Sequence, residues 1–254
     1  YGAIDFYRAA KKRGIHPVIG CEVYVAPRSR HDRAYTGGEW HSHLILLCEN
    51  MAGYRNLIHM VSLGFIEGFY MKPRVDHELL KQYHEGLICL SACLAGELPR
   101  LISDGRYEEA KKTALWYRDV FGEGNYFLEI QDHGIPEQAE VNRQLIRMSK
   151  ETGIPLVATN DAHYLTREDA ALQDVLMAIQ MGKTVDDPTR MKFQTEEFYI
   201  KSEGEMRQLF ADAPEALSNT LQIAARCQVE FEFGKYHLPQ FDVPEGYSAE
   251  TYLR

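Results

Sequence analysis

Two side chains that could share a metal ion lie two residues apart, just past the middle of the chain. Asp161 and His163 follow a short apolar run, residues 154–158, which predicts a buried strand with a polar tip. In an extended chain such residues point to the same side. A carboxylate beside an imidazole at a strand end forms half of a metal site. The alternative is an Asp–His hydrogen bond within a turn.

Further donors stand in the two predicted strands at residues 17–25 and 41–48. Glu22 lies inside the first strand, and a buried carboxylate is costly unless it meets a cation, a metal or several donors. A salt-bridged or edge-exposed glutamate is the alternative. His41 and His43 share one face of the second strand by its period of two, so either imidazole is a candidate ligand.

A thiol follows the next predicted strand, residues 86–91. Cys93 lies just past that strand end, as Asp161 does past its own, although a single cysteine is more often a small buried thiol. Asp132 and His133 follow the strand at 125–130 and are weaker candidates, because adjacent residues diverge in an extended chain. His, Asp, Glu and Cys together suit zinc, manganese or iron, and not calcium.

Cations that could contact phosphate lie in two predicted loops. Arg28 and Arg30 belong to the densest basic patch in the chain, within residues 28–40, and Arg74 closes a loop at 68–74. Exposed loop cations are more often simply solvated.

Elements that would position these side chains alternate between strand and helix from residue 1 to residue 164. Apolar periodicity predicts helices at 3–12, 51–65, 75–83, 107–120 and 136–152 between the strands. We expect an α/β fold, in which functional groups gather at the carboxyl ends of the strands. Asp76 is expected to cap the helix at 75–83, and Gly153 to follow the end of the helix at 136–152.

The rhythm changes after residue 164. Helices are predicted at 168–181, 203–210 and 213–227, with a capping box between Ser202 and Glu205 and a short strand at 198–200. We therefore divide the chain into a barrel core at 1–164, a helical remainder at 165–234 and a linker at 235–254 that is rich in Pro and Gly.

The overall charge bounds the class of protein. The formal net charge of −9 argues against a dedicated non-specific nucleic-acid binder, but not against an enzyme whose metal ions supply positive charge. The five cysteines, an odd number at irregular spacing, indicate free thiols and a cytoplasmic protein. No apolar run approaches a membrane span.

At this point a family resemblance is clear. The chain resembles the PHP (polymerase and histidinol phosphatase) domain found at the N-terminus of bacterial DNA polymerase III alpha subunits, with its N-terminal part missing. The segments that carry the resemblance include Gly14-Ile-His-Pro-Val-Ile-Gly-Cys-Glu22, Ser42-His-Leu-Ile-Leu-Leu47, Lys72-Pro-Arg-Val-Asp76, Asn125-Tyr-Phe-Leu-Glu129 and Ala158-Thr-Asn-Asp-Ala-His-Tyr164.

The resemblance implies a distorted (β/α)₇ TIM-like barrel, here without its first strands, followed by a small helical segment. It also implies a rim cluster of up to three zinc or manganese ions. The metal ligands it implies in this chain are Glu22, His43, Cys93, Asp161 and His163. Of these, Glu22, Asp161 and His163 would serve catalysis, and Arg28, Arg30 and Arg74 would contact phosphate.

The implied parent protein is a DNA-directed DNA polymerase that acts in replication with primer-template DNA and other replicase subunits. Its PHP site would be a metal-dependent phosphoesterase, a 3′–5′ exonuclease that proofreads. The alternative is a metal-stabilised scaffold that docks a separate proofreading exonuclease subunit; a free-standing phosphatase of the histidinol-phosphate type is a weaker third. The polymerase palm would follow Arg254. This piece alone, with only part of the ligand set, is expected to be inactive.

Overall fold

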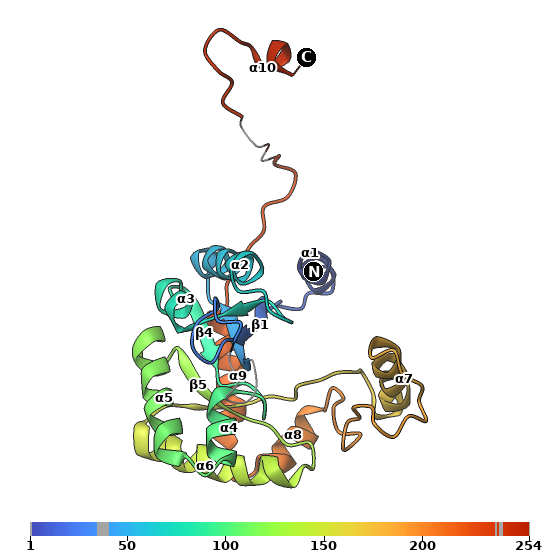
Figure 1. The fold of residues 1–254 in the computed structure, drawn as a ribbon. Coiled ribbons are helices and arrows are strands. Elements are labelled where there is room, and N and C mark those ends of the chain that lie inside the picture. Colours follow the sequence, from blue (N-terminus) through green and yellow to red (C-terminus); the bar gives the residue numbers. More distant parts are fainter. Residues whose placement is uncertain (1, 35–40, 237, 239–240, 254) are drawn as a thin grey trace.

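The computed structural model describes residues 2–34, 41–236, 238 and 241–253. One six-stranded sheet forms the centre of the fold (Figure 1). Its strands are β1 (Gly20–Val25), β2 (Ser42–Cys48), β3 (Arg74–Val75), β4 (Leu87–Leu90), β5 (Tyr126–Ile130) and β6 (Leu156–Ala158).

Helices connect and cover these strands. They are α1 (Ala3–Lys12), α2 (Met51–Ile66), α3 (His77–Gln82), α4 (Glu97–Ser103), α5 (Tyr107–Phe121), α6 (Pro136–Thr152), the 3₁₀ turn η1 (Arg167–Asp169), α7 (Ala170–Gln180), α8 (Glu203–Leu209), α9 (Pro214–Arg226) and α10 (Ala249–Tyr252). The helices expected from periodicity are confirmed to within a few residues. The helix α4 was not predicted from the sequence.

Local chemistry explains several helix ends. The Asp76 carboxylate accepts the Leu79 N–H and begins α3, and Ser202 forms a capping box with Glu205 at the start of α8, as expected. Gly153 ends α6 in the left-handed conformation, with φ 74°. The Asn50 side chain accepts the Ala52 and Gly53 N–H groups and starts α2.

The strand order is β3-β1-β2-β4-β5-β6. β2 runs antiparallel to both of its neighbours, whereas β1 pairs in parallel with β3, and β4, β5 and β6 pair in parallel. The start of β2 therefore lies at the same edge of the sheet as the ends of β1, β4, β5 and β6. We call this edge the rim.

The sheet departs from strict strand–helix alternation. In the described residues no helix lies between β1 and β2. These two strands pair antiparallel, and an antiparallel pair needs no crossover helix. Within the described residues no ladder joins β3 to β6, so the sheet is a mixed α/β layer consistent with a TIM-like fold and not a closed barrel. The strand expected at 198–200 is reduced to a single bridge between Tyr164 and Tyr199.

The two faces of the sheet carry different cores. Alternate residues such as Val23, Leu46, Cys89 and Leu128 point to the outer face and join the main hydrophobic core with the helices around it. Leu46 is 0% exposed, and complete burial of a leucine contributes about 1.5–3 kcal/mol. The opposite, inner face carries a smaller cluster, which Ile223 of α9 and Cys227, directly after α9, cover.

The C-terminal residues leave the sheet. Phe231 and Phe233 still pack against Tyr7 of α1. Beyond them the chain runs away from the body towards the short helix α10 (Figure 1). Among the described residues, none of the helices is both long enough and apolar enough to span a membrane.

Candidate functional site

The inner face of the sheet is apolar in one half and polar in the other. Strand register places Glu22 opposite Ile45 and Tyr24 opposite His43, so these four side chains share one face. The ladder continues this face through Leu90 and Phe127 to Glu129 and Val157. Towards the rim, the polar members of this face form a cluster of potential metal donors.

Three predicted ligands meet at one nitrogen. The Nδ1 atom of His43 lies 3.2 Å from Oε1 of Glu22 and 3.6 Å from Sγ of Cys93. Glu22 comes from β1, His43 from the start of β2, and Cys93 from the turn after β4. The antiparallel direction of β2 is what brings His43 to the same rim as the other two.

The other two predicted ligands form a second pair at the end of β6. Nε2 of His163 lies 3.4 Å from Oδ1 of Asp161. The backbone N–H of His163 donates to the backbone carbonyl of Phe198 at 2.8 Å, and the His163 ring packs against Phe193 and Phe198. Asp161 adopts φ 39°, an unusual conformation for a residue with a side chain. Side-chain exposures of 29% and 38% leave both groups accessible.

The two groups of ligands influence each other's pKa values. Burial raises the pKa of the Glu22 carboxyl, and the Asp161 carboxylate raises it further, whereas His163 lowers it. Burial also raises the pKa of the Cys93 thiol to about 12. Burial and the nearby Arg100 cation lower the pKa of His43, which favours the neutral imidazole with a free lone pair.

The pKa shifts of the second pair have the directions expected of an ion pair. Burial alone would raise the pKa of Asp161, but the hydrogen bond from His163 and the neighbouring imidazoles lower it overall. The same hydrogen bond raises the pKa of His163, against the effect of burial. The rim therefore combines an ionised carboxylate with a neutral thiol and a neutral imidazole.

The five predicted ligands thus contact one another in a group of three and a group of two, and do not surround one point. Among the described residues, no group of three or more His, Cys, Asp and Glu side chains is placed so that it could hold a metal ion as it stands. The donor types suit zinc or manganese. Side-chain rotations at the rim are needed before they could surround an ion.

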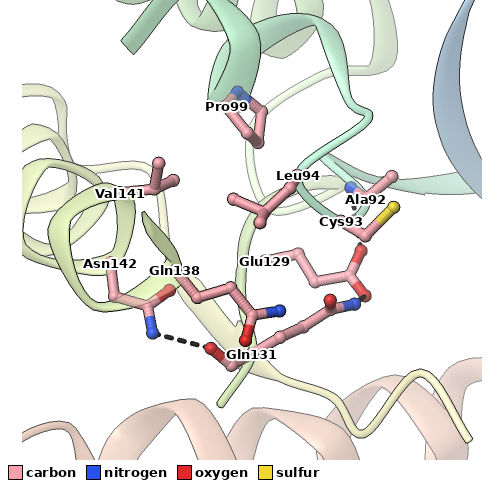
Figure 2. A pocket seen from close by; sticks show the side chains of 9 residues that line it. All are labelled: Ala92, Cys93, Leu94, Pro99, Glu129, Gln131, Gln138, Val141 and Asn142. Carbon is pink, nitrogen blue, oxygen red and sulfur yellow. Dashed lines mark hydrogen bonds between the residues drawn. The ribbon is translucent and has the colours of Figure 1, made fainter. Parts of the chain in front are cut away.

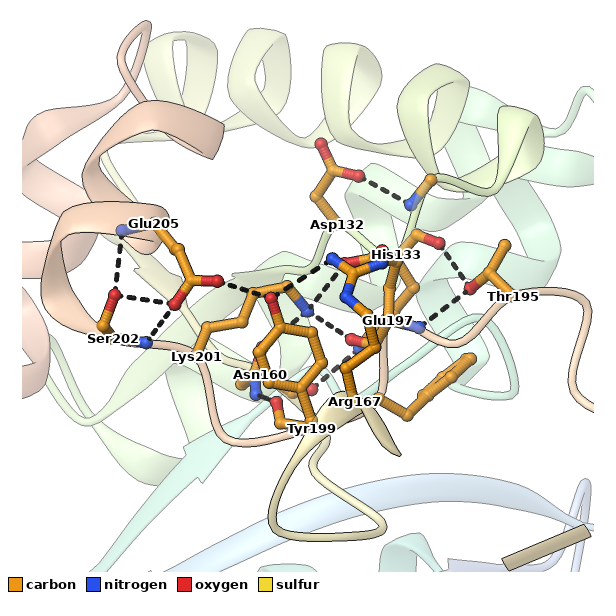
Figure 3. Close-up of polar contacts among 12 residues, drawn as sticks. Asp132, His133, Asn160, Arg167, Thr195, Glu197, Tyr199, Lys201, Ser202 and Glu205 are labelled. Carbon is orange, nitrogen blue, oxygen red and sulfur yellow. Dashed lines mark hydrogen bonds and ion pairs between the residues drawn. The ribbon is translucent and has the colours of Figure 1, made fainter. Parts of the chain in front are cut away.

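The weaker candidates have other partners. Asp132 accepts the Gly134 N–H in a turn. His133 is fully buried, stacks on Phe198 with ring centroids 4.0 Å apart, and bonds through Nε2 to the Asn160 carbonyl at 2.7 Å (Figure 3). His133 thus supports the chain just before Asp161. His41 stacks on His43 with ring centroids 5.9 Å apart.

The basic candidates are engaged elsewhere. Arg74 is 0% exposed, and its guanidinium donates to the backbone carbonyls of Gly68, Arg30 and Asp32. The Arg30 guanidinium contacts three carboxylates, those of Glu67, Asp76 and Glu78. These two cations hold the loop after β1, so the structure does not support phosphate binding by either.

Arg28 differs from these two cations. Its guanidinium pairs with Asp32 but is 64% exposed. Residues 35–40 of the expected basic loop lie outside the described residues.

Glu129 was not predicted as a site residue, although it lies among them. It is a carboxylate in the middle of a buried strand, 5% exposed, and it accepts hydrogen bonds from Ala92, Gln131 and Thr159. Burial raises its pKa to about 7, against the effect of these hydrogen bonds. The signal was the one used for Glu22, an acidic residue within an apolar strand.

A polar network holds the segment that packs against His133 and His163. Tyr199 donates its hydroxyl hydrogen to Glu205, and Arg167 pairs with Glu197 (Figure 3). Lys201 has a side chain only 2% exposed, 3.7 Å from Glu197, with its ammonium over the Tyr199 ring. This network supports the end of β6 from the C-terminal side.

Comparisons with known proteins identify the family of this chain. A family model described as the PHP domain matches residues 1–133. The DNA polymerase III subunit alpha of Treponema pallidum (strain Nichols) is 49% identical over 256 residues, which cover 100% of this chain and 22% of that protein. The protein of the same name from Thermus aquaticus is 42% identical, again over 100% of this chain and 21% of the relative. The chain thus spans about a fifth of the length of these relatives.

Proposed function

The chain belongs to the PHP domain family, and from this premise we propose that it is the PHP portion of a DNA polymerase III alpha subunit and carries a metal-dependent 3′–5′ exonuclease site at the rim. The relatives named above, at 42–49% identity, support the placement in DNA replication. The rim cluster supports the chemistry. The exonuclease would act on the 3′ ends of primers that the polymerase has extended.

One observation carries the proposal. Glu22 of β1, His43 of β2 and Cys93 of the turn after β4 meet at His43 Nδ1, within 3.6 Å. The Asp161 carboxylate is close enough to raise the pKa of Glu22. Five donors of three chemical types on one rim are unusual unless a ligand uses them, because neighbouring carboxylates such as Asp161 and Glu22 repel each other without a cation between them.

Three of the donors, Asp161, His43 and Cys93, differ in whether they must lose a proton to bind zinc or manganese. The ionised Asp161 and the neutral His43 could bind without losing a proton, whereas Cys93, with a pKa of about 12, would have to release one. When bound, such ions supply activation of water and neutralisation of phosphate oxygens. His163 holds Asp161 in orientation through their hydrogen bond.

The test uses the full-length protein without deoxynucleotides. Bound metal is measured by elemental analysis, and digestion of primer 3′ ends is measured with added manganese or zinc. Asp161→Asn should lower the digestion rate by at least about 10-fold, because it removes an anionic donor. Asp132→Asn is the matched control: Asp132 accepts a turn hydrogen bond that Asn can also accept, so the rate should stay unchanged. Digestion that survives Asp161→Asn would refute the proposal.

A second function has its own support. As the side chains stand, no three donors within the described residues could hold an ion, and the net charge of −9 disfavours a DNA groove. Both observations fit a non-catalytic scaffold that binds a separate exonuclease subunit. Metal would stabilise this scaffold only after the rim side chains rotate around an ion. Bound metal without any digestion by the wild-type protein would favour this second function.

A further inference from the structure

A buried carboxylate lies between the two groups of rim ligands without being one of them. Glu129 stands on β5, between β4, whose end leads to Cys93, and β6, whose end leads to Asp161. By strand register its side chain points to the inner face together with Glu22 and Val157. The two oxygens of its carboxylate bond in different directions.

One oxygen holds the turn that carries Cys93. Oε2 of Glu129 accepts the Ala92 N–H at 2.9 Å. In return, the Glu129 N–H donates to Oγ of Ser91 at 2.8 Å. Ala92 adopts φ 64°, a left-handed conformation that is unfavourable for a residue with a Cβ atom. The reciprocal bonds hold the backbone in that conformation, directly before the thiol that faces His43.

The other oxygen holds the strand end that carries Asp161. Oε1 of Glu129 accepts from the Thr159 hydroxyl and, at 3.1 Å, from Nε2 of Gln131. Nε2 of Gln131 also donates to the Thr159 hydroxyl oxygen at 3.1 Å. Asp161 follows two residues later with φ 39°. Met71, Ala92 and Asp161 are the residues other than glycine with positive φ in the described chain, and two of these three adjoin the bonds of Glu129.

The surroundings of the carboxylate are polar and tightly packed. Figure 2 shows Glu129 and Gln131 beside Ala92 and Cys93, around a cavity of about 10 Å³, which has room for about one water molecule. Oε1 of Gln131 is buried and has no hydrogen-bond partner among the described residues. If the Gln131 side-chain amide rotates by half a turn, its oxygen can accept a hydrogen bond from a donor at position 129, such as the amide of Glu129→Gln.

We propose that Glu129 is a positioning residue of the rim, whose carboxylate ties the Cys93 turn to the Asp161 strand end and so sets the distance between the two groups of ligands. This inference rests on the proposed metal site for its consequence, but the tie itself exists without metal. Loss of these hydrogen bonds should therefore loosen both segments together. It should also weaken the binding of a metal ion whose ligands come from both segments.

Three variants of the full-length protein separate the contributions. Glu129→Leu keeps the approximate volume and removes both acceptors. Glu129→Gln keeps a carbonyl oxygen for Ala92, and its amide can donate to the turned Gln131. Thr159→Val removes the bond to the Asp161 side alone and leaves the bond to Ala92.

The first measurement is amide hydrogen exchange with a chelator present. Glu129→Leu should speed exchange about 10-fold or more in both the 91–93 and the 159–161 segments, and Thr159→Val only in the second. Glu129→Gln should resemble the wild type. A uniform increase over the whole sheet, or an increase at one segment alone in Glu129→Leu, would overturn the proposal.

The second measurement uses cobalt(II) as the metal probe and follows the thiolate-to-cobalt absorption band. Glu129→Leu should bind at least 10-fold more weakly and lose the band, whereas Glu129→Gln should retain it. An unchanged affinity and band in Glu129→Leu would also overturn the proposal. Failure of the wild-type protein to bind any metal would refute the proposed function instead, and the exchange experiment would still decide the role of Glu129.

Discussion

Replacement of Arg74 by methionine tests whether this cation is structural or binds phosphate. The guanidinium is fully buried and donates to the carbonyls of Gly68 at 3.2 Å, Arg30 at 3.1 Å and Asp32 at 2.8 Å. Methionine fills most of the same apolar volume but leaves the Arg30 and Asp32 carbonyls without this donor, whereas the Gly68 carbonyl still accepts the backbone N–H of residue 74 at 3.3 Å. At about 1 kcal/mol for each of the three hydrogen bonds lost, Arg74→Met should destabilise the fold by about 3 kcal/mol.

Urea unfolding of the 254-residue chain, followed by tryptophan fluorescence, measures this loss. Arg28→Met is the matched control, because that side chain is 64% exposed and its pair with Asp32 lies at the surface. The control should change the unfolding free energy by less than about 0.5 kcal/mol. If Arg74→Met leaves stability unchanged and instead weakens cleavage by the full-length protein, Arg74 is a phosphate ligand and the reasoning from burial is wrong.

Three further outcomes are expected, each measured by urea unfolding of the chain. The native pKa of Glu129 is about 7, against an ordinary value of 4.5; the stability linked to its proton is therefore complete below about pH 4.5 and is lost as the pH rises through 7. With a chelator present, the wild-type protein should lose about 3 kcal/mol of unfolding free energy in this way, and Glu129→Gln should not. Equal slopes of unfolding free energy against pH in the two proteins would contradict this prediction. Gly53→Ala would place a Cβ atom 1.8 Å from the Gly86 carbonyl oxygen and should cost more than about 3 kcal/mol. In the control Gly204→Ala, the new Cβ atom would lie 3.9 Å from Oγ of Ser202, so the variant should be neutral or stabilised by up to about 1 kcal/mol. Tyr126→Phe removes a buried hydroxyl that has no hydrogen-bond partner among the described residues, so stability should stay equal or rise, and a loss above 1 kcal/mol would reveal an undetected partner.

The local sequence pattern predicted most of the helices and strands, because these elements depend mainly on residues close to one another in the chain. The caps at Asp76 and Ser202 and the left-handed Gly153 follow from residue type and spacing alone. The Asp161 and His163 side chains do lie 3.4 Å apart beyond a strand end, but Asp161 has φ 39°, so the chain there is not extended and the spacing of two residues does not explain their contact. The short strand β3 and the helix α4 carry no clear periodicity and were missed, because tertiary contacts decide such short elements.

Which side chains meet was decided by the tertiary structure. A strand's period of two assigns its faces, but not its direction, and only the antiparallel course of β2 brings His43 to the rim with Glu22 and Cys93. Arg74 looked like a loop cation because its acceptors, the carbonyls of Arg30 and Asp32, lie more than 40 residues away. A buried charge is stabilised by such distant partners, which local sequence does not show. For the rim, residue types predicted the candidate donors, whereas long-range strand pairing determined which of them come together.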